Sequence, residues 1–324
     1  MRILITGGGG FVGSALARRI LAAGSLAVGG APAAEVEELV LADLVAPAPD
    51  LVADPRVRAA TGDLATVLAG EQGADLVFHL AGVVSGAAEA DFDLGMATNL
   101  DATRAVLEWC RSRAVPPVLV FSSSIAVFGH DPALPRIEEV TDDTLPRPQT
   151  SYGTQKLIGE LLVADYARKG FVRGRSVRLM TVSVRPGRPN AAASGFLSGI
   201  IREPLAGERA VCPVPPDTPV ALSSPRRTLE GLLRAAEVSD ELWGSRTAMT
   251  LPGITTTPRA MAAALDRVAG AGTSDLIEWR EDAAIIAMIE GWPAVFRTDR
   301  ARALGLAPEE SFDDIVRAYI DDLR

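Results

Sequence analysis

Hydrophobic residues in the first half of the chain form short continuous runs separated by longer segments of helical periodicity. Residues 2–6 (RILIT) hold three consecutive apolar side chains and lead into glycines, whereas residues 11–24 repeat apolar positions at helical spacing. Buried strands that alternate with helices form a parallel sheet covered on both faces, so we expect a doubly wound α/β fold. Further strands are expected at 38–44, 57–64, 74–82, 116–124 and 176–186, and further helices at 90–114 and 151–169.

The pattern becomes less regular in the second half. Prolines cluster within residues 212–227, and short strands and helices alternate unevenly. We therefore expect residues 1–186 to form a nucleotide-binding domain and residues 187–324 to form a smaller α/β substrate lobe. This lobe is expected to be discontinuous, with some segments returning to the first domain. Residues 24–37, rich in Gly and Ala, are expected to form a surface loop.

Composition excludes several classes of partner. The 324-residue chain has a net charge of −9, whereas general nucleic-acid binding needs a surplus of Lys and Arg. No run approaches the roughly 18 apolar residues of a membrane span, and the N-terminal apolar stretch is too short for a signal peptide. The two cysteines and two histidines lack the spacing of a metal site. We therefore expect a cytoplasmic protein with no metal and no nucleic-acid or membrane partner.

Glycines lie between the first expected strand and the first expected helix. Gly7 suits a tight turn, Gly10 allows the backbone to approach a pyrophosphate, and Gly13 allows helix and strand to pack closely. The helix that begins near Phe11 and Val12 offers its amides and the positive end of its dipole to a phosphate. This order of strand, glycines and helix predicts a dinucleotide site of the Rossmann type.

Acidic residues close two of the following strands. Asp43 ends the second strand, where an acid binds the ribose hydroxyls of a dinucleotide. A carboxylate there repels a 2′-phosphate, so we expect NAD rather than NADP as the cofactor. Asp63, beside Leu64, ends the next strand and is a candidate for contact with the adenine, although a simple helix N-cap explains it almost as well.

One tyrosine and one lysine stand out because both residue types are rare here. Lysine occurs only at positions 156 and 169, and tyrosine at three positions, yet Tyr152 and Lys156 are four residues apart at the start of a helix. This spacing places them on one face, where an ammonium stabilises a phenolate and lowers its pKa. A tyrosine so tuned can act as a general base, so we expect Tyr152 and Lys156 to be catalytic.

Three consecutive serines, residues 122–124, end the strand at 116–124. Hydroxyls at the carboxyl end of a strand face the ligand crevice of an open α/β sheet. Such a hydroxyl can hold the substrate oxygen that exchanges a proton with Tyr152. Serines at a strand end also serve turns, so the pattern alone leaves both interpretations open.

The motif TGGxGxxG at Thr6–Gly13, the acid at the second strand end, the serine-rich strand and the YxxxK pair together resemble the extended short-chain dehydrogenase/reductases, the NAD-dependent epimerase/dehydratase family. The resemblance implies that Ser124 is the catalytic hydroxyl and that Ala81 and Gly82 pass under the cofactor. It also implies that Asn99 lies beside the cofactor and that two long helices pair across a two-fold axis in a homodimer. His79 looks like strand packing rather than a ligand.

Long segments of the chain, including SYGTQKLIGELLVADY, resemble more closely the members of this family that oxidise a four-carbon sugar acid at C2. Arginine binds a carboxylate through two hydrogen bonds, and four arginines stand in the expected substrate lobe of an acidic protein: Arg185, Arg188, Arg226 and Arg227. Arg226 or Arg227 is the preferred partner of the substrate carboxylate. Candidates for contacts with substrate hydroxyls are Ser85, Ser123, Ser124, Asn190 and Ser194.

Two other functions remain open at this point. An NDP-sugar 4-epimerase would use the same tyrosine, lysine and serine but return the hydride to its substrate, and the same arginines could bind a pyrophosphate. A non-catalytic NAD-binding regulatory protein is disfavoured, because such proteins lose the tyrosine or the lysine, and both Tyr152 and Lys156 are present.

Overall fold

A seven-stranded parallel sheet forms the centre of the protein in the computed structural model, which describes residues 1–187 and 193–323. The strand order is β12-β8-β7-β6-β1-β4-β5, and each neighbouring pair runs parallel. The expected doubly wound α/β fold is therefore confirmed. The strands are β1 (Arg2–Thr6), β4 (Glu38–Asp43), β5 (Val57–Thr61), β6 (Leu76–His79), β7 (Val118–Ser124), β8 (Arg173–Leu179) and β12 (Met249–Thr250).

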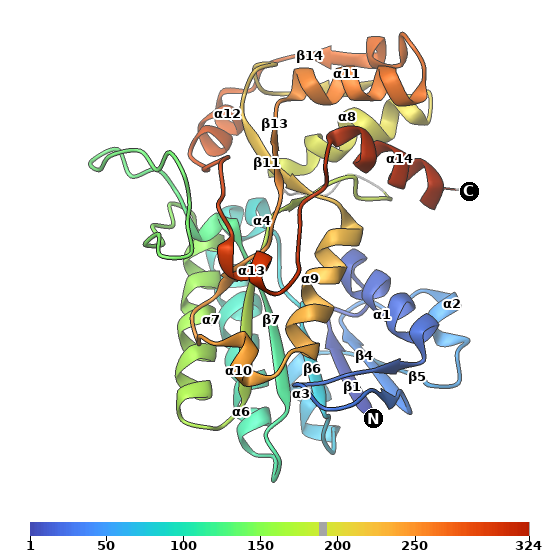
Figure 1. Cartoon of the computed structure of the whole chain (residues 1–324), viewed down its shortest axis with the longest axis vertical. Helices are drawn as coiled ribbons and strands as arrows, with labels where there is room; N and C mark the ends of the chain where they lie inside the picture. The colour runs from blue at the N-terminus through green and yellow to red at the C-terminus, as the bar shows by residue number, and fades with distance from the viewer. Residues whose placement is uncertain (188–192, 324) are drawn as a thin grey trace.

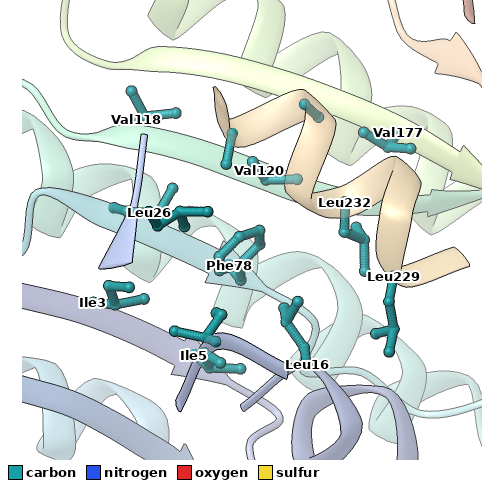
Figure 2. Close-up of a cluster of buried hydrophobic side chains, with 14 of the residues drawn as sticks. Ile3, Ile5, Leu16, Leu26, Phe78, Val118, Val120, Val177, Leu229 and Leu232 are labelled. Atoms are coloured by element: carbon teal, nitrogen blue, oxygen red, sulfur yellow. The ribbon is translucent and has the colours of Figure 1, made fainter. Parts of the chain in front are cut away.

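Helices cover both faces of this sheet (Figure 1). On one face, α1 (Phe11–Ala23) and α9 (Pro225–Glu237) pack against apolar side chains of the central strands, as Figure 2 shows for Leu16, Leu229 and Leu232 around Phe78. On the other face lie α3 (Leu64–Gly70), α6 (Ala102–Arg111) and α7 (Ser151–Arg168). Apart from the exposed edge strand β5, the strands between these layers are buried on both sides, which explains their continuous apolar runs.

The segment expected as one long helix at 90–114 is divided, so that expectation is wrong. It contains α5 (Phe92–Gly95), a π-helical stretch η1 (Met96–Asp101) and α6, and the preceding helix α4 (Ser85–Ala90) is separate. Asp91 accepts a hydrogen bond from the backbone amide of Leu94 at 2.9 Å and so starts a new helix. The π-helical stretch places Asn99 at the carboxyl end of the sheet, which matters for the site described below.

A smaller lobe lies above the carboxyl ends of the strands (Figure 1). Two small sheets form it, one of three strands and one of two, covered by helices that share an apolar core. Its strands are β9 (Thr181–Val182), β11 (Val220–Ser223) and β13 (Ile254–Thr256), and β10 (Ala210–Cys212) with β14 (Ile277–Trp279). Its helices are α8 (Phe196–Leu205), α11 (Pro258–Ala269), α12 (Ala283–Glu290) and α14 (Phe312–Asp322), with the 3-10 turns η3 (Ala193–Gly195) and η4 (Thr273–Leu276).

Parts of the second half of the chain pack into the first domain. Helix α9 and strand β12 contribute to the core against the central strands, as do α10 (Asp240–Trp243) and α13 (Asp299–Ala303). The first domain also contains α2 (Pro49–Val52) and the 3-10 turn η2 (Ile125–Val127). Within the described residues, no helix is both long and apolar enough to cross a membrane.

The glycine- and alanine-rich segment at 24–37 forms a short hairpin of β2 (Ser25–Leu26) and β3 (Ala34–Glu35). The backbone amides of Gly29 and Gly30 donate to carbonyls at the end of α9, at 2.8 and 2.7 Å. The segment is therefore docked against the domain.

Candidate active site

Backbone contacts, rather than side chains, shape the turn between β1 and α1. Gly7 has φ +76°, and a Cβ atom there would lie 2.7 Å from the amide nitrogen of Ala81. A Cβ on Gly13 would lie 2.1 Å from the carbonyl oxygen of Gly7, which no side chain tolerates. Helix α1 begins at Phe11 after Gly10, without a side-chain cap, so its first amides can bind an anion.

Asp43 joins the end of β4 to the glycine turn. Its Oδ2 atom accepts a hydrogen bond from the amide of Gly9 at 2.9 Å, and Oδ1 accepts one from the amide of Val45 at 3.2 Å. The carboxylate is thus fixed beside the turn, where the sequence predicts a ribose contact. Asp63 is the N-cap of α3 and accepts a hydrogen bond from the amide of Thr66 at 3.2 Å, directly before Leu64. A contact of Asp63 or Leu64 with adenine stays a prediction.

Asn99 connects the strand end after β6 to α7. Its Oδ1 atom accepts a hydrogen bond from the amide of Val83 at 2.9 Å, and its Nδ2 atom donates to Gln155 Oε1 at 2.8 Å. A Cβ on Gly82 would lie 2.7 Å from Asn99 Oδ1 and 3.5 Å from Lys156 Nζ. Gly82 therefore passes closely over these side chains, while a contact of Ala81 and Gly82 with the cofactor stays a prediction.

His79 packs inside the sheet, as expected from the sequence. Its ring nitrogens lie 2.6 Å from the hydroxyl of Thr6 and 3.0 Å from that of Thr103. Burial lowers the pKa of His79 to about 3, with a smaller contribution from the charge of Lys156. The ring is therefore neutral and structural.

Tyr152 and Lys156 lie on one face of α7, near the carboxyl end of β7. Thr150 caps the helix by accepting a hydrogen bond from the amide of Gly153 at 3.1 Å. Lys156 is buried, and its Nζ atom lies 5.7 Å from the centre of the Tyr152 ring and donates to the carbonyl of Ser122 at 2.9 Å. The helix and the strand end together hold the ammonium in one place.

Burial and nearby charges shift the pKa values of both Tyr152 and Lys156. Burial raises the pKa of Tyr152 and outweighs the hydrogen bond with Ser124 and the positive charge of Arg185, which lower it. The expectation that Lys156 lowers the tyrosine pKa is therefore wrong for the net direction, because burial dominates. Burial also lowers the pKa of Lys156 to about 8, against the opposing charge of Glu160.

Ser123 serves a buried ion pair. Its hydroxyl donates to Glu160 Oε1 at 2.5 Å, and Arg178 donates to both oxygens of the same carboxylate at 2.8 and 2.7 Å. Ser123 thus borders the site, but its hydroxyl is engaged with Glu160. Ser124 is the serine that faces Tyr152.

One cavity of about 230 Å³ brings eight of the predicted site residues together. It is lined by Val12, Gly82, Ser85, Ser123, Ser124, Tyr152, Lys156 and Ser194, among others. Strand-end, helical and lobe segments meet there, since the cavity lies at the carboxyl edge of the parallel sheet. Arg185, one of the four arginines considered from the sequence, lines it too, and the lining residues that the sequence did not single out include Thr181 and Trp292.

Arg226 and Arg227 lie outside this cavity, so the preference for them as carboxylate partners needs correction. Ser224 caps α9 and makes SPRR the first turn of a helix of the first domain. Arg226 is exposed, and Arg227 donates to Glu230 at 2.8 Å. Arg188 and Asn190 lie outside the described residues.

Arg185 is the arginine that lines the cavity. Its backbone amide donates to Ser198 Oγ at 3.0 Å, and its carbonyl accepts a hydrogen bond from Arg202 at 2.8 Å, which fixes the segment after β9. Within residues 1–187 and 193–323, no carboxylate pairs with its guanidinium. Its place at the carboxyl end of the predicted strand at 176–186 was the available signal. The sequence around Trp292 contains no motif that would predict its place in the cavity.

The residues at this edge of the sheet fit a dinucleotide. The glycine turn has no side chains where Cβ atoms would crowd the backbone. Asp43 lies at the end of the neighbouring strand, and Gly82 and Lys156 border the cavity. Phosphates would lie at the start of α1, and a nicotinamide riboside would reach the cavity beside Tyr152 and Lys156.

Comparison of the sequence with known proteins identifies the family and similar relatives. Residues 3–221 match the model of the NAD dependent epimerase/dehydratase family. The chain is 50% identical over 326 aligned residues to D-erythronate dehydrogenase of Cupriavidus necator, covering 99% of this chain and 98% of that protein. It is 40% identical to D-erythronate dehydrogenase of Haemophilus influenzae, covering 99% of both chains.

Solved structures show the same architecture. A crystal structure described as the nucleoside-diphosphate-sugar epimerase from Agrobacterium tumefaciens is 41% identical, with a TM-score of 0.88 over 99% of this chain and 94% of that one. A holo-form L-threonine dehydrogenase from Cupriavidus necator, 22% identical over the whole of both chains, shares the fold with a TM-score of 0.84. The predictions of NAD as cofactor and of an oxidoreductase are confirmed, and the chain belongs to the NAD-dependent epimerase/dehydratase family.

Proposed function

We propose that this protein oxidises the C2 hydroxyl of a small sugar acid, D-erythronate or a close analogue, to the 2-oxo acid with NAD. The observation that carries the proposal is Arg185, a guanidinium without an acidic partner among the described residues, in the same small cavity as Tyr152 and Ser124. Two relatives named D-erythronate dehydrogenase, similar over nearly the whole chain, support the choice of substrate.

Arg185 would bind the substrate carboxylate. Arg185 is half-buried, and a partly buried guanidinium is stabilised by a counter-charge; a carboxylate accepts two parallel hydrogen bonds from it. Burial and the neighbouring Arg202 both lower the pKa of Arg185, which shows how unfavourable its charge is without a partner. A bound acid would supply that partner and orient C2 relative to Tyr152.

Tyr152 would accept the proton of the C2 hydroxyl. The Ser124 hydroxyl bonds with Tyr152 and can hold the same substrate oxygen, so the oxygen, the serine and the tyrosine form one short chain. The positive charge of Arg185 favours the phenolate against the effect of burial. NAD, when bound, supplies the nicotinamide ring that accepts the hydride released from C2.

Lys156 would hold the ribose hydroxyls and the position of Tyr152. Its ammonium is fixed by the carbonyl of Ser122 and lies against the Tyr152 ring. Arginine would not replace it, because a guanidinium is larger and offers its donors in a fixed fork. The arrangement orients reacting groups, which is a large part of enzymatic rate enhancement.

An NDP-sugar epimerase is the second candidate, since the structure from Agrobacterium tumefaciens carries that description. An NDP-sugar is far larger than a four-carbon acid. The cavity beside Tyr152 measures about 230 Å³, below the roughly 300–1,000 Å³ of sites for drug-sized ligands. The size of the cavity therefore favours the small acid.

A substrate panel tests the proposal. Four- to six-carbon aldonic acids are incubated with NAD and the protein, and reduced nicotinamide is followed by absorbance, with UDP-sugars assayed alongside. We expect net reduction of NAD with a four-carbon acid. Interconversion of a UDP-sugar without net reduced NAD would establish the epimerase instead, and NAD binding without turnover of any compound would favour a regulatory protein.

The homodimer and the cytoplasmic location remain predictions. Phe92, Leu94 and Leu161 on α5 and α7 are exposed apolar side chains, on the elements that the resemblance implies at a two-fold interface. Light scattering of the purified protein would decide the assembly.

A further inference from the structure

Two cavities of different size lie on either side of Trp292. The catalytic cavity, about 230 Å³, has Trp292 in its wall together with Tyr152 and Arg185. A second cavity, about 570 Å³, lies between the loop at 129–138 and the segment after α12, and Trp292 lines it too. One side chain therefore belongs to both walls.

A very small void lies between the two cavities. Its volume is about 10 Å³, room for no more than a single water. Ile125 and Thr181 border this void and the catalytic cavity, whereas Ile289 and Pro293 border the void and the second cavity. Trp292 lines all three spaces. The partition is thus a thin layer of side chains, and Trp292 is the residue common to all three spaces.

Hydrogen bonds on both sides hold the segment that carries Trp292. The carbonyl of Gly291 accepts a hydrogen bond from the amide of His130 at 2.9 Å, and the carbonyl of Val295 accepts one from Val140 at 2.9 Å. Thr255 of β13 donates to the carbonyl of Ala294 at 2.6 Å. The segment is tied to the first domain and to the smaller lobe, so the indole forms a fixed wall.

The second cavity has a polar lining that suits a hydroxylated chain. Arg136, Glu138, Asp217 and Glu290 border it. His130 borders it too, and its buried Nδ1 atom has no hydrogen-bond partner among the described residues. A buried polar atom without a partner is costly, so a rotation of the His130 ring toward the cavity would let a substrate hydroxyl satisfy it.

We propose that Trp292 sets the chain length of the substrate by closing the catalytic cavity toward the second cavity. The inference rests on the proposed sugar-acid dehydrogenase activity. With the carboxylate at Arg185 and C2 at Tyr152, a four-carbon acid ends at the indole. A five- or six-carbon acid would need the space beyond it, where His130 and the charged groups could bind its terminal hydroxyls.

The test compares Trp292→Ala and Trp292→Leu with the unmodified protein on D-erythronate and on six-carbon aldonic acids. We expect the ratio of kcat/KM for the six-carbon over the four-carbon acid to rise at least about tenfold, the lower end of what a pocket gains from one methylene. Trp279→Ala is the matched control, since Trp279 is 42% exposed on β14, outside the cavities. It should leave the ratio unchanged.

Measurements of melting temperature and NAD binding establish that each variant is folded. If Trp292→Ala does not fold, the comparison is made with Trp292→Leu alone. An unchanged ratio in a folded variant, or an equal loss on both acids, would overturn the role of Trp292. Failure of the unmodified protein to oxidise any aldonic acid would instead remove the proposed function and this inference with it. The two failures are therefore distinguishable.

Discussion

The two halves of the active site are built by different means. The glycine turn at residues 7–13 is one contiguous stretch whose shape follows from backbone contacts, with a Cβ on Gly13 only 2.1 Å from a carbonyl oxygen. The substrate wall is assembled from single side chains of distant segments, among them Ser85, Arg185 and Trp292. The first half admits almost no substitution, whereas each side chain of the second can be changed separately. This difference suits a family that keeps one cofactor and varies its substrates.

Tyr152 stands where the two halves meet, and its removal should have the largest effect. Tyr152→Phe removes only the hydroxyl, so we expect NAD binding to persist and kcat to fall by about 10²- to 10⁴-fold, the usual share of general acid–base catalysis. Tyr166→Phe is the matched control on the same helix, because Tyr166 bonds with Glu108 at the surface. Normal turnover of Tyr152→Phe would remove the tyrosine from the mechanism.

Gly13→Ala tests the rigidity of the cofactor half. The added methyl would collide with the carbonyl of Gly7, so the turn must open, and we expect NAD affinity to fall at least about tenfold, or roughly 1.4 kcal/mol. Gly70→Ala is the control, since nothing lies within 4 Å of a Cβ at that helical position. Calorimetry with NAD measures both. Undiminished affinity in Gly13→Ala would show that the shape of the turn does not determine NAD affinity.

The pH dependence tests the charges around Tyr152. Because its pKa is raised by burial, the phenolate is scarce at neutral pH, and kcat/KM for oxidation should rise with pH. Lys156 has a pKa of about 8, so above that pH its ammonium loses its charge and the rise should flatten. The reverse reduction should show the opposite trend. An oxidation rate that falls as the pH approaches 8 from below would contradict this assignment.

Asp43→Asn should have the smallest effect, on cofactor choice. The amide oxygen can still accept the hydrogen bond from Gly9, so the turn is kept, but the charge that repels a 2′-phosphate is lost. We expect kcat/KM with NADP relative to NAD to rise by a few-fold, up to about tenfold. Asp63→Asn, at the N-cap of α3, is the control. Equal changes in both variants would argue against a specific role for Asp43.

The sequence predicted what local patterns determine. The strands, the glycine turn, the Tyr152–Lys156 pair and the packing of His79 all follow from residues close together in the chain. The division of the helix expected at 90–114 was missed, because the π-helical stretch and the cap at Asp91 depend on contacts of Asn99 and on a single capping side chain.

The substrate wall could not be predicted in the same way. SPRR looked like a carboxylate site because two arginines are adjacent, but Ser224 makes it a helix start on the first domain. Arg185 lines the cavity because of the path of the segment after β9. Trp292 lies more than a hundred residues farther along the chain and lines the same cavity. Spatial proximity of this kind has no local signature.

The role of Arg185 as the carboxylate partner is tested most directly by changing the residue and the substrate together. Arg185→Met and the unmodified protein are assayed with D-erythronate and with its uncharged amide, and Arg226→Met serves as the exposed control. A hydrogen bond to a charged group is worth about 1.5–3 kcal/mol, so we expect Arg185→Met to lower kcat/KM for the acid by roughly ten- to 150-fold. The same change should leave kcat/KM for the amide almost unaffected. Equal losses on acid and amide, or a selective loss in Arg226→Met instead, would contradict the proposed sugar-acid site.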